Sequence, residues 1–112
     1  MMNVVVLQGT LSSEPVERTL PSGANVMDWQ VTTEVEGVKL SVPVTWDDPP
    51  RRALQIDTGD SVVVLGTVRR RFFTAGGVTQ SRTEVVARRM ATPRQRATLA
   101  KLLVEAQEEL AA

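Results

Sequence analysis

The stretch "SVVVLGTVRRRFFTAGGVTQSRTEVVARRM", residues 61–90, has the pattern of two long strands joined by a tight turn. A valine-rich run leads to Gly66, where a bulge or a sharp bend suits a strand. "AGGV" then closes a hairpin, and Gly76 with Gly77 makes a favoured two-residue turn. The sequence therefore predicts a long β-hairpin over this whole stretch.

Three shorter strand-like segments precede the hairpin: "NVVVLQGTL" at residues 3–11, "VMDWQVTTEV" at 26–35 and "VKLSVPVTW" at 38–46. Apolar and polar residues alternate along the second, as in a half-buried strand, and Trp29 follows the apolar side. We therefore expect Trp29 in the core. A polar connection with a Pro-Ser-Gly turn separates the first two segments. "DDPPRRALQID" at 47–57 has room for one or two helical turns.

Five strands with one helical connection between the third and the fourth, rich in valine and glycine, predict an all-β domain. The architecture that fits best is a five-stranded Greek-key barrel of the OB type. An open β-sandwich is the alternative. We expect the barrel to occupy residues 1–90.

The last segment, residues 91–112, changes character and predicts an amphipathic helix. Thr92 suits the N-cap, Pro93 the first helical position, and Gln95 completes a capping box. The expected apolar stripe comprises Leu99, Leu102, Leu103, Ala106 and Leu110. A single helix is marginal by itself, so this stripe needs the barrel or another subunit to cover it.

The 112-residue chain contains no cysteine and no histidine. This composition removes disulfides, the usual zinc ligands and any nucleophile activated by histidine. We therefore expect no enzyme, no metal and no cofactor. No apolar run approaches the roughly 20 residues that span a membrane, and "MMNVVVLQGT" lacks the features of a signal peptide. The expected compartment is the cytoplasm, with no membrane partner.

Positive charge is concentrated in residues 51–90, where eight arginines stand against three carboxylates, although the whole chain has no net charge. The predicted turn places Arg71 directly opposite Arg82. Like charges at such positions cost stability, and a bound polyanion would relieve them. Arg82 is therefore a candidate phosphate contact together with Arg71.

Two of the four aromatic residues also lie in this hairpin. Phe73 shares a face with Arg69 and Arg71, and its ring could stack on a base of any identity. Phe72 lies on the opposite face, and we assign it to packing. A long exposed hairpin kept from aggregating by its charge explains the same residues without any ligand.

Several stretches resemble, in order and spacing, the bacterial single-stranded DNA-binding proteins, a family with the OB fold. They are "NVVVLQGTLSSEPVERTLPSGANVMDWQVTT", "VTWDDPP", "TGDSVVVLGTVRRRFFT" and "TEVVA", and they cover nearly all of residues 3–90. The resemblance implies a homo-oligomer, a tetramer or a dimer, that wraps single-stranded DNA without sequence preference. A role in replication, repair or recombination would follow.

The resemblance also assigns particular residues. Arg69 and Arg71 match basic contacts of the family, and Phe73 matches a stacking aromatic residue. Trp46 matches a second stacking residue, which we expect to be partly exposed near the groove. The alternation of residues 38–46 instead places Trp46 on the core side, so both interpretations stay open.

Three departures from the family pattern affect the expected function. A bare "EG" turn replaces a long loop with basic and aromatic contacts, and Asp47 and Asp48 stand where basic residues are expected. A helix stands in place of the acidic tail that recruits protein partners. We therefore expect a smaller, weaker footprint and no docking of this kind, as in a divergent short paralogue. An OB module used only for protein contacts, or a binder of single-stranded RNA, is the alternative.

Overall fold

The computed structural model describes residues 1–112, apart from the side chain of Leu54. The strands are β1 (Val5–Leu11), β2 (Val16–Thr19), β3 (Asn25–Val35), β4 (Val38–Asp47), β5 (Ser61–Ala75) and β6 (Val78–Ala91). The helices are the short 3₁₀ helix η1 (Arg51–Gln55) and the α-helix α1 (Arg96–Ala111).

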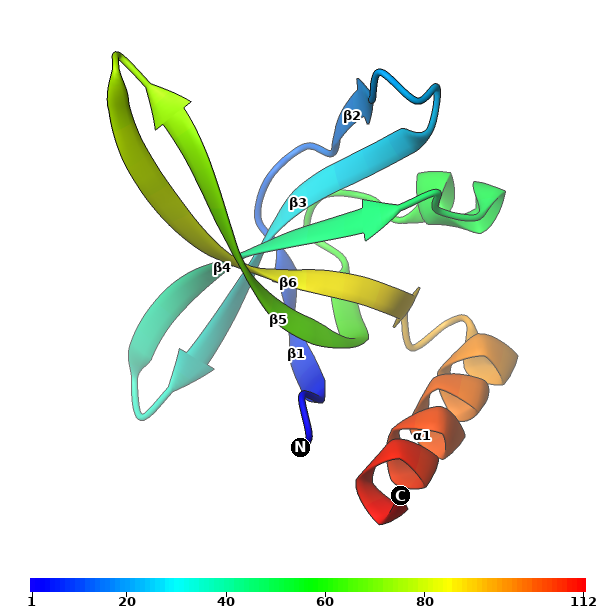
Figure 1. Cartoon of the computed structure of the whole chain (residues 1–112). Coiled ribbons are helices and arrows are strands. Elements are labelled where there is room, and N and C mark those ends of the chain that lie inside the picture. Colours follow the sequence, from blue (N-terminus) through cyan, green and yellow to red (C-terminus); the bar gives the residue numbers. More distant parts are fainter.

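The strands close into a barrel because β1 pairs with β5 along its length and with β3 at its end, both antiparallel. β3 pairs antiparallel with β4 and β5 with β6, whereas β4 and β6 run parallel. With η1 between β4 and β5, this is the five-stranded Greek-key arrangement of an OB-fold barrel (Figure 1). The predicted fold class is confirmed, and the open sandwich is wrong because β1 joins the two edges of the sheet.

The strand β2 lies in a segment that we expected to be only a polar connection. Its four residues pair with Asn25–Asp28 of β3. A strand this short and this polar has no apolar run by which the sequence could reveal it. The turn after it is as predicted: Gly23 has a φ of 86°, and its N–H donates to the Leu20 carbonyl oxygen at 2.8 Å.

Two glycines allow neighbouring strands to approach closely. A Cβ atom on Gly66 would lie 2.1 Å from the Val86 carbonyl oxygen, and one on Gly9 would lie 2.4 Å from that of Thr32. The register between β5 and β6 shifts between Leu65 and Gly66. The bulge predicted at Gly66 is confirmed, and glycine is needed there because any side chain would collide with the backbone of β6.

The core of the barrel is built from the inward-facing residues of β1, β3, β4, β5 and β6. Trp29 is only 1 % exposed, as predicted, and its ring centroid lies 6.3 Å from that of Trp46. Ala53 of η1 and the adjacent Ile56 are also buried in this cluster, so the helical connection covers part of the core. The outer part of the β5–β6 hairpin contributes none of its described residues to this core.

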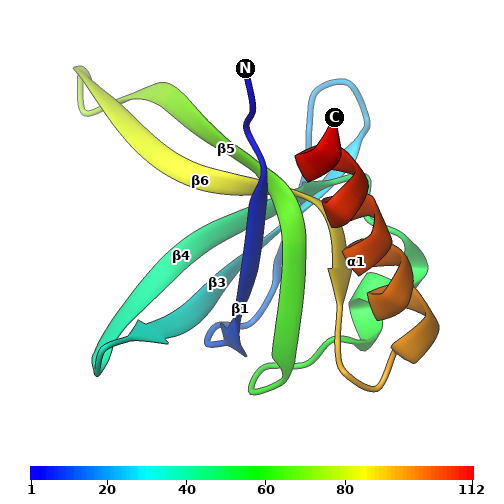
Figure 2. The ribbon, with the colours of Figure 1, turned by 90° about the horizontal axis from the view of Figure 1, so that it is seen from below.

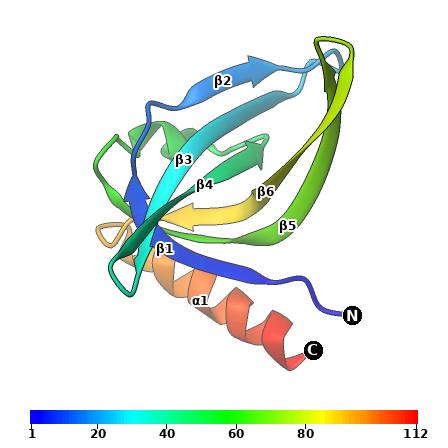
Figure 3. The same cartoon turned by 90° about the vertical axis from the view of Figure 1, so that its left-hand side faces the viewer.

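The helix α1 packs against the outside of the barrel, on β5 and β6 (Figures 2 and 3). Its buried residues are Leu102 and Ala106, with Leu99 partly covered. Leu103 and Leu110, which we expected in the same stripe, are exposed. The contact is centred on Leu102, and Leu103 lies roughly 100° further round the helix, while Leu110 lies beyond the last buried residue, Ala106.

The helix also begins later than predicted, at Arg96 and not directly after Thr92. The Gln95 N–H donates to the Thr92 carbonyl oxygen, and the Thr92 N–H donates to Gln95 Oε1, both at 3.0 Å. The second of these bonds is one half of the predicted capping box. The Thr92 hydroxyl does not form the other half, since it has no hydrogen-bond partner among the described residues.

Candidate nucleic-acid interface

The β5–β6 hairpin extends well past the barrel (Figures 1 and 2). β1 pairs with β5 only from Ser61 to Gly66, and the Asn3 side chain then bonds the N–H and the carbonyl of Val68, both at 2.9 Å. β4 pairs with β6 only from Val85 to Ala87. Within the described residues, the outer part of the hairpin therefore pairs only with itself.

The hairpin turn has the predicted geometry. Gly76 and Gly77 have φ values of 60° and 78°, in the left-handed region that favours glycine. The predicted register is confirmed for Arg69 with Glu84, Arg71 with Arg82, and Phe73 with Gln80. The two glycines thus fix which side chains share each face of the hairpin.

One face, here called the arginine face, carries Arg69, Arg71 and Phe73 from β5 with Arg82 and Glu84 from β6. Glu84 is only 3 % exposed. Arg69 Nη2 donates to Glu84 Oε2 at 2.7 Å, and Arg71 Nε lies 3.6 Å from Oε1. One buried carboxylate therefore holds two guanidinium groups, and it relieves part of the repulsion expected between Arg71 and Arg82.

The arginine face leaves part of its guanidinium groups open to solvent. The side chains of Arg69 and Arg71 are 42 % and 38 % exposed, although both contact Glu84. Phe73 is 40 % exposed, and the Arg71 guanidinium carbon lies 6.0 Å from its ring centroid. An oxyanion and a flat ring could therefore both find partners on this face.

The arginine face continues onto β3 through a hollow of about 290 Å³ that Arg82 lines together with Asp28, Gln30 and the segment before β2. Arg18 of β2 donates to Asp28 through Nε at 2.5 Å. Burial alone would raise the pKa of Asp28, but the hydrogen bond from Arg18, the contact with Thr45 and the charges of Arg18 and Arg82 together hold this pKa below its ordinary value. The sequence did not point to this pair because β2 was not foreseen.

Trp46 is buried, with 5 % of its surface exposed, so the expectation that it is partly exposed in a groove is wrong. Its Cα pairs with Met27 of β3 on one side and Ala87 of β6 on the other. Alternation along β4 therefore turns the indole into the barrel, as the pattern of residues 38–46 indicated. Base stacking needs an open ring face, and Trp46 offers none in this structure.

Phe72 is the opposite case. We assigned it to packing, but 67 % of its surface is exposed. It lies on the face of the hairpin opposite the arginine face, beyond the point where β1 and β4 end. The signal that could have revealed this is strand length, because β5 has 15 residues and β1 only seven.

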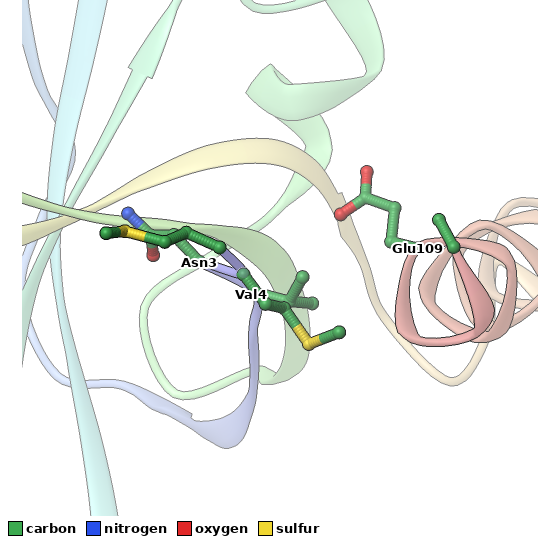
Figure 4. Close-up of a pocket in the computed structure, with 6 residues that line it drawn as sticks. Asn3, Val4 and Glu109 are labelled. Atoms are coloured by element: carbon green, nitrogen blue, oxygen red, sulfur yellow. The ribbon is translucent and has the colours of Figure 1, made fainter.

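A separate cavity of about 430 Å³ lies between the residues before β1 and the last turn of α1 (Figure 4). Asn3, Val4 and Glu109 line it from these two sides, and Glu109 also forms an ion pair with Arg88 of β6. The predicted site residues lie on other parts of the molecule.

No protein-family model matches the chain, and no curated protein matches it. Among the residues that the structure describes, no helix is long and apolar enough to cross a membrane. In the same residues, no three side chains of the histidine, cysteine, aspartate and glutamate types are grouped so that they could hold a metal ion.

Proposed function

We propose that the chain binds single-stranded DNA without sequence preference. Arg69, Arg71 and Arg82 contact phosphates, and the ring of Phe73 stacks on a base. The observation that carries this proposal is the gathering of these four side chains on one open face of a hairpin that projects from an OB-fold barrel. OB folds bind oligonucleotides at the same position, between the loop of this hairpin and the neighbouring sheet face.

The same face supports binding that ignores base identity and is modest in strength. Phosphates and ring faces are common to all nucleotides, so neither contact reads sequence. Glu84 and Asp28 partly offset the positive charge of the neighbouring arginines, Arg18 included. The chain would therefore need several copies, or a long strand, for tight binding.

We also propose that the chain acts as a homo-oligomer, with a tetramer as the first expectation, and serves replication, repair or recombination. The exposed Leu103, Val104 and Leu110 of α1 support assembly, because leucine and valine side chains at a helix surface favour burial. Light scattering should return a multiple of the 12.2 kDa chain mass at micromolar concentration. A monomer mass would contradict assembly.

One observation favours a different function: the Glu84 carboxylate already forms an ion pair with Arg69 and so gives this arginine a partner without any ligand. It favours a module that makes protein contacts only. Anisotropy of end-labelled oligo-dT, titrated with the protein at low and moderate salt, separates the two functions. Binding that weakens with salt supports the proposal, and a flat titration at low salt contradicts it.

The same titration with oligo-dA and with oligo-U tests selectivity. Equal affinities for oligo-dT and oligo-dA are expected if contacts reach only phosphates and ring faces. Tighter binding of oligo-U than of oligo-dT would assign the site to RNA instead. A labelled oligonucleotide is the better reporter here, because both tryptophans of the protein are buried.

A further inference from the structure

The β5–β6 hairpin carries a second arginine–phenylalanine pair, on the face opposite the arginine face. The Arg70 guanidinium carbon lies 5.8 Å from the Phe72 ring centroid, against 6.0 Å for Arg71 and Phe73. Successive residues of a strand point to opposite sides, so the two pairs lie back to back. The hairpin therefore repeats the same local chemistry on both of its faces.

The second pair is the more available of the two. Phe72 is 67 % exposed and Phe73 40 %. Arg70 Nη2 donates to the Ser81 hydroxyl at 3.2 Å, and within the described part of the chain no carboxylate lies at ion-pair distance from Arg70. Arg71, by contrast, shares Glu84 with Arg69. The positive charge on the Phe72 face is thus uncompensated, which suits a polyanion.

Both faces can be reached from solvent. In Figures 1 and 2 the hairpin stands away from the barrel, and β1 and β4 end before this part of it. A strand lying on one face could pass around the edge or the glycine turn to the other face. A nucleotide chain confined to one face could not touch both rings.

We propose that Phe72 and Arg70 form a second stacking site for single-stranded nucleic acid, so that a bound strand wraps around the hairpin and contacts both faces. The inference rests on the proposed function. Stacking on an aromatic ring ignores base identity, and an adjacent arginine adds a phosphate or cation–π contact. We assign a nucleic acid strand rather than a protein as the occupant for two reasons. The exposed Phe72 ring can stack on a base, and Arg70, which no carboxylate of the described residues neutralises, can contact a phosphate.

The test compares Phe72→Ala with the wild type on labelled oligo-dT of two lengths, about 4 and about 16 nucleotides, which bracket the site sizes of single OB folds. The long oligonucleotide should bind the variant roughly 5- to 150-fold more weakly, as expected for one lost stacking contact. The short one should lose about twofold or less, because it still fits on the Phe73 face. Phe72→Leu should behave as Phe72→Ala does, and Phe72→Trp should restore binding and have its emission quenched by the long oligonucleotide.

Val78→Ala is the matched control, because Val78 is an exposed apolar residue of the same hairpin without an aromatic ring. It should bind both lengths as the wild type does.

If Phe73→Ala weakens binding and Phe72→Ala does not at either length, the second site is refuted while the proposed function stands. If Phe72→Ala instead lowers the assembly mass in light scattering with oligonucleotide affinity unchanged, the ring serves a protein contact and the inference is wrong. If the wild type binds neither oligonucleotide, the proposed function itself fails.

Discussion

The part of β5 inside the barrel and the part beyond it follow the same alternation of side chains but end in opposite environments. Val62 and Val64 are fully buried, because the strands around them enclose their side chains. Phe72 and Phe73, further along the same strand, are exposed because neither β1 nor β4 extends that far. Alternation decides which residues share a face, whereas closure of the barrel decides whether that face meets core or solvent.

The largest difference between the two regions should appear in stability. Trp29→Ala removes a fully enclosed indole from the barrel and should lower the free energy of unfolding by about 3–5 kcal/mol. Urea denaturation followed by far-ultraviolet circular dichroism measures this loss. Phe73→Ala, in the projecting hairpin, should change the same quantity by less than about 0.5 kcal/mol.

Equal losses for the two variants would break the comparison. They would mean that the Phe73 ring is covered in the folded protein, as it would be if another copy of the chain packed on the arginine face. Repeating the denaturation at two protein concentrations identifies this case, because stability that depends on assembly rises with concentration.

The second difference should appear in the salt dependence of oligo-dT binding. Each phosphate neutralised on a single strand contributes about −0.7 to the slope of log K against log salt. Changing Arg69, Arg71 and Arg82 together to Ala should flatten the slope by about two units for each protomer engaged. Anisotropy titrations at several salt concentrations measure it.

The control removes the same charge elsewhere. Arg51, Arg94 and Arg96 are exposed and lie outside the hairpin, so changing them to Ala lowers net charge equally. This variant should flatten the slope much less than the hairpin variant does. Identical slopes in the two variants would show that binding responds to net charge and not to the arginine face.

The stacking contribution should be smaller and insensitive to salt. Phe73→Ala should weaken oligo-dT binding by about 1–3 kcal/mol, since one base loses its aromatic partner. The slope against salt should stay that of the wild type because no charge changes. Phe73→Trp is the conservative control and should retain affinity. A loss that disappears at low salt would contradict stacking at this position.

The contrast between barrel and hairpin also explains what the sequence could predict. The five strands of the barrel, the bulge at Gly66 and the register of the hairpin were predictable, because valine runs and glycine pairs act locally. The environment of Phe72 was assigned wrongly, because it depends on where the distant strands β1 and β4 end. The family resemblance favoured an open Trp46, while the alternation of β4 alone placed it correctly.

The partners of the charged residues were the least predictable part of the site. Glu84 could be placed opposite Arg69 from the turn, but its sharing with Arg71 is a diagonal contact that depends on strand twist. The Arg18–Asp28 pair depends on β2, which leaves no pattern in the sequence. Such contacts arise from the three-dimensional approach of short polar segments and not from any local preference.

The smallest expected effect concerns that pair and acid pH. Because the pKa of Asp28 is lower in the folded protein than its ordinary value of 3.8, its stabilising contribution is complete above the unfolded pKa. The contribution is lost as the pH falls below 3.8 and through the folded pKa. The pair is partly exposed to solvent, so it should contribute only about 0–1 kcal/mol.

Asp28→Asn and Arg18→Gln should each make the free energy of unfolding less dependent on pH in this window. The double variant should show no further change, because either substitution already removes the interaction. Urea denaturation at several pH values between about 2 and 5 measures the three profiles. Additive effects in the double variant would show that Asp28 owes its low pKa to other positive charges, with Arg82 across the hollow as the first to test.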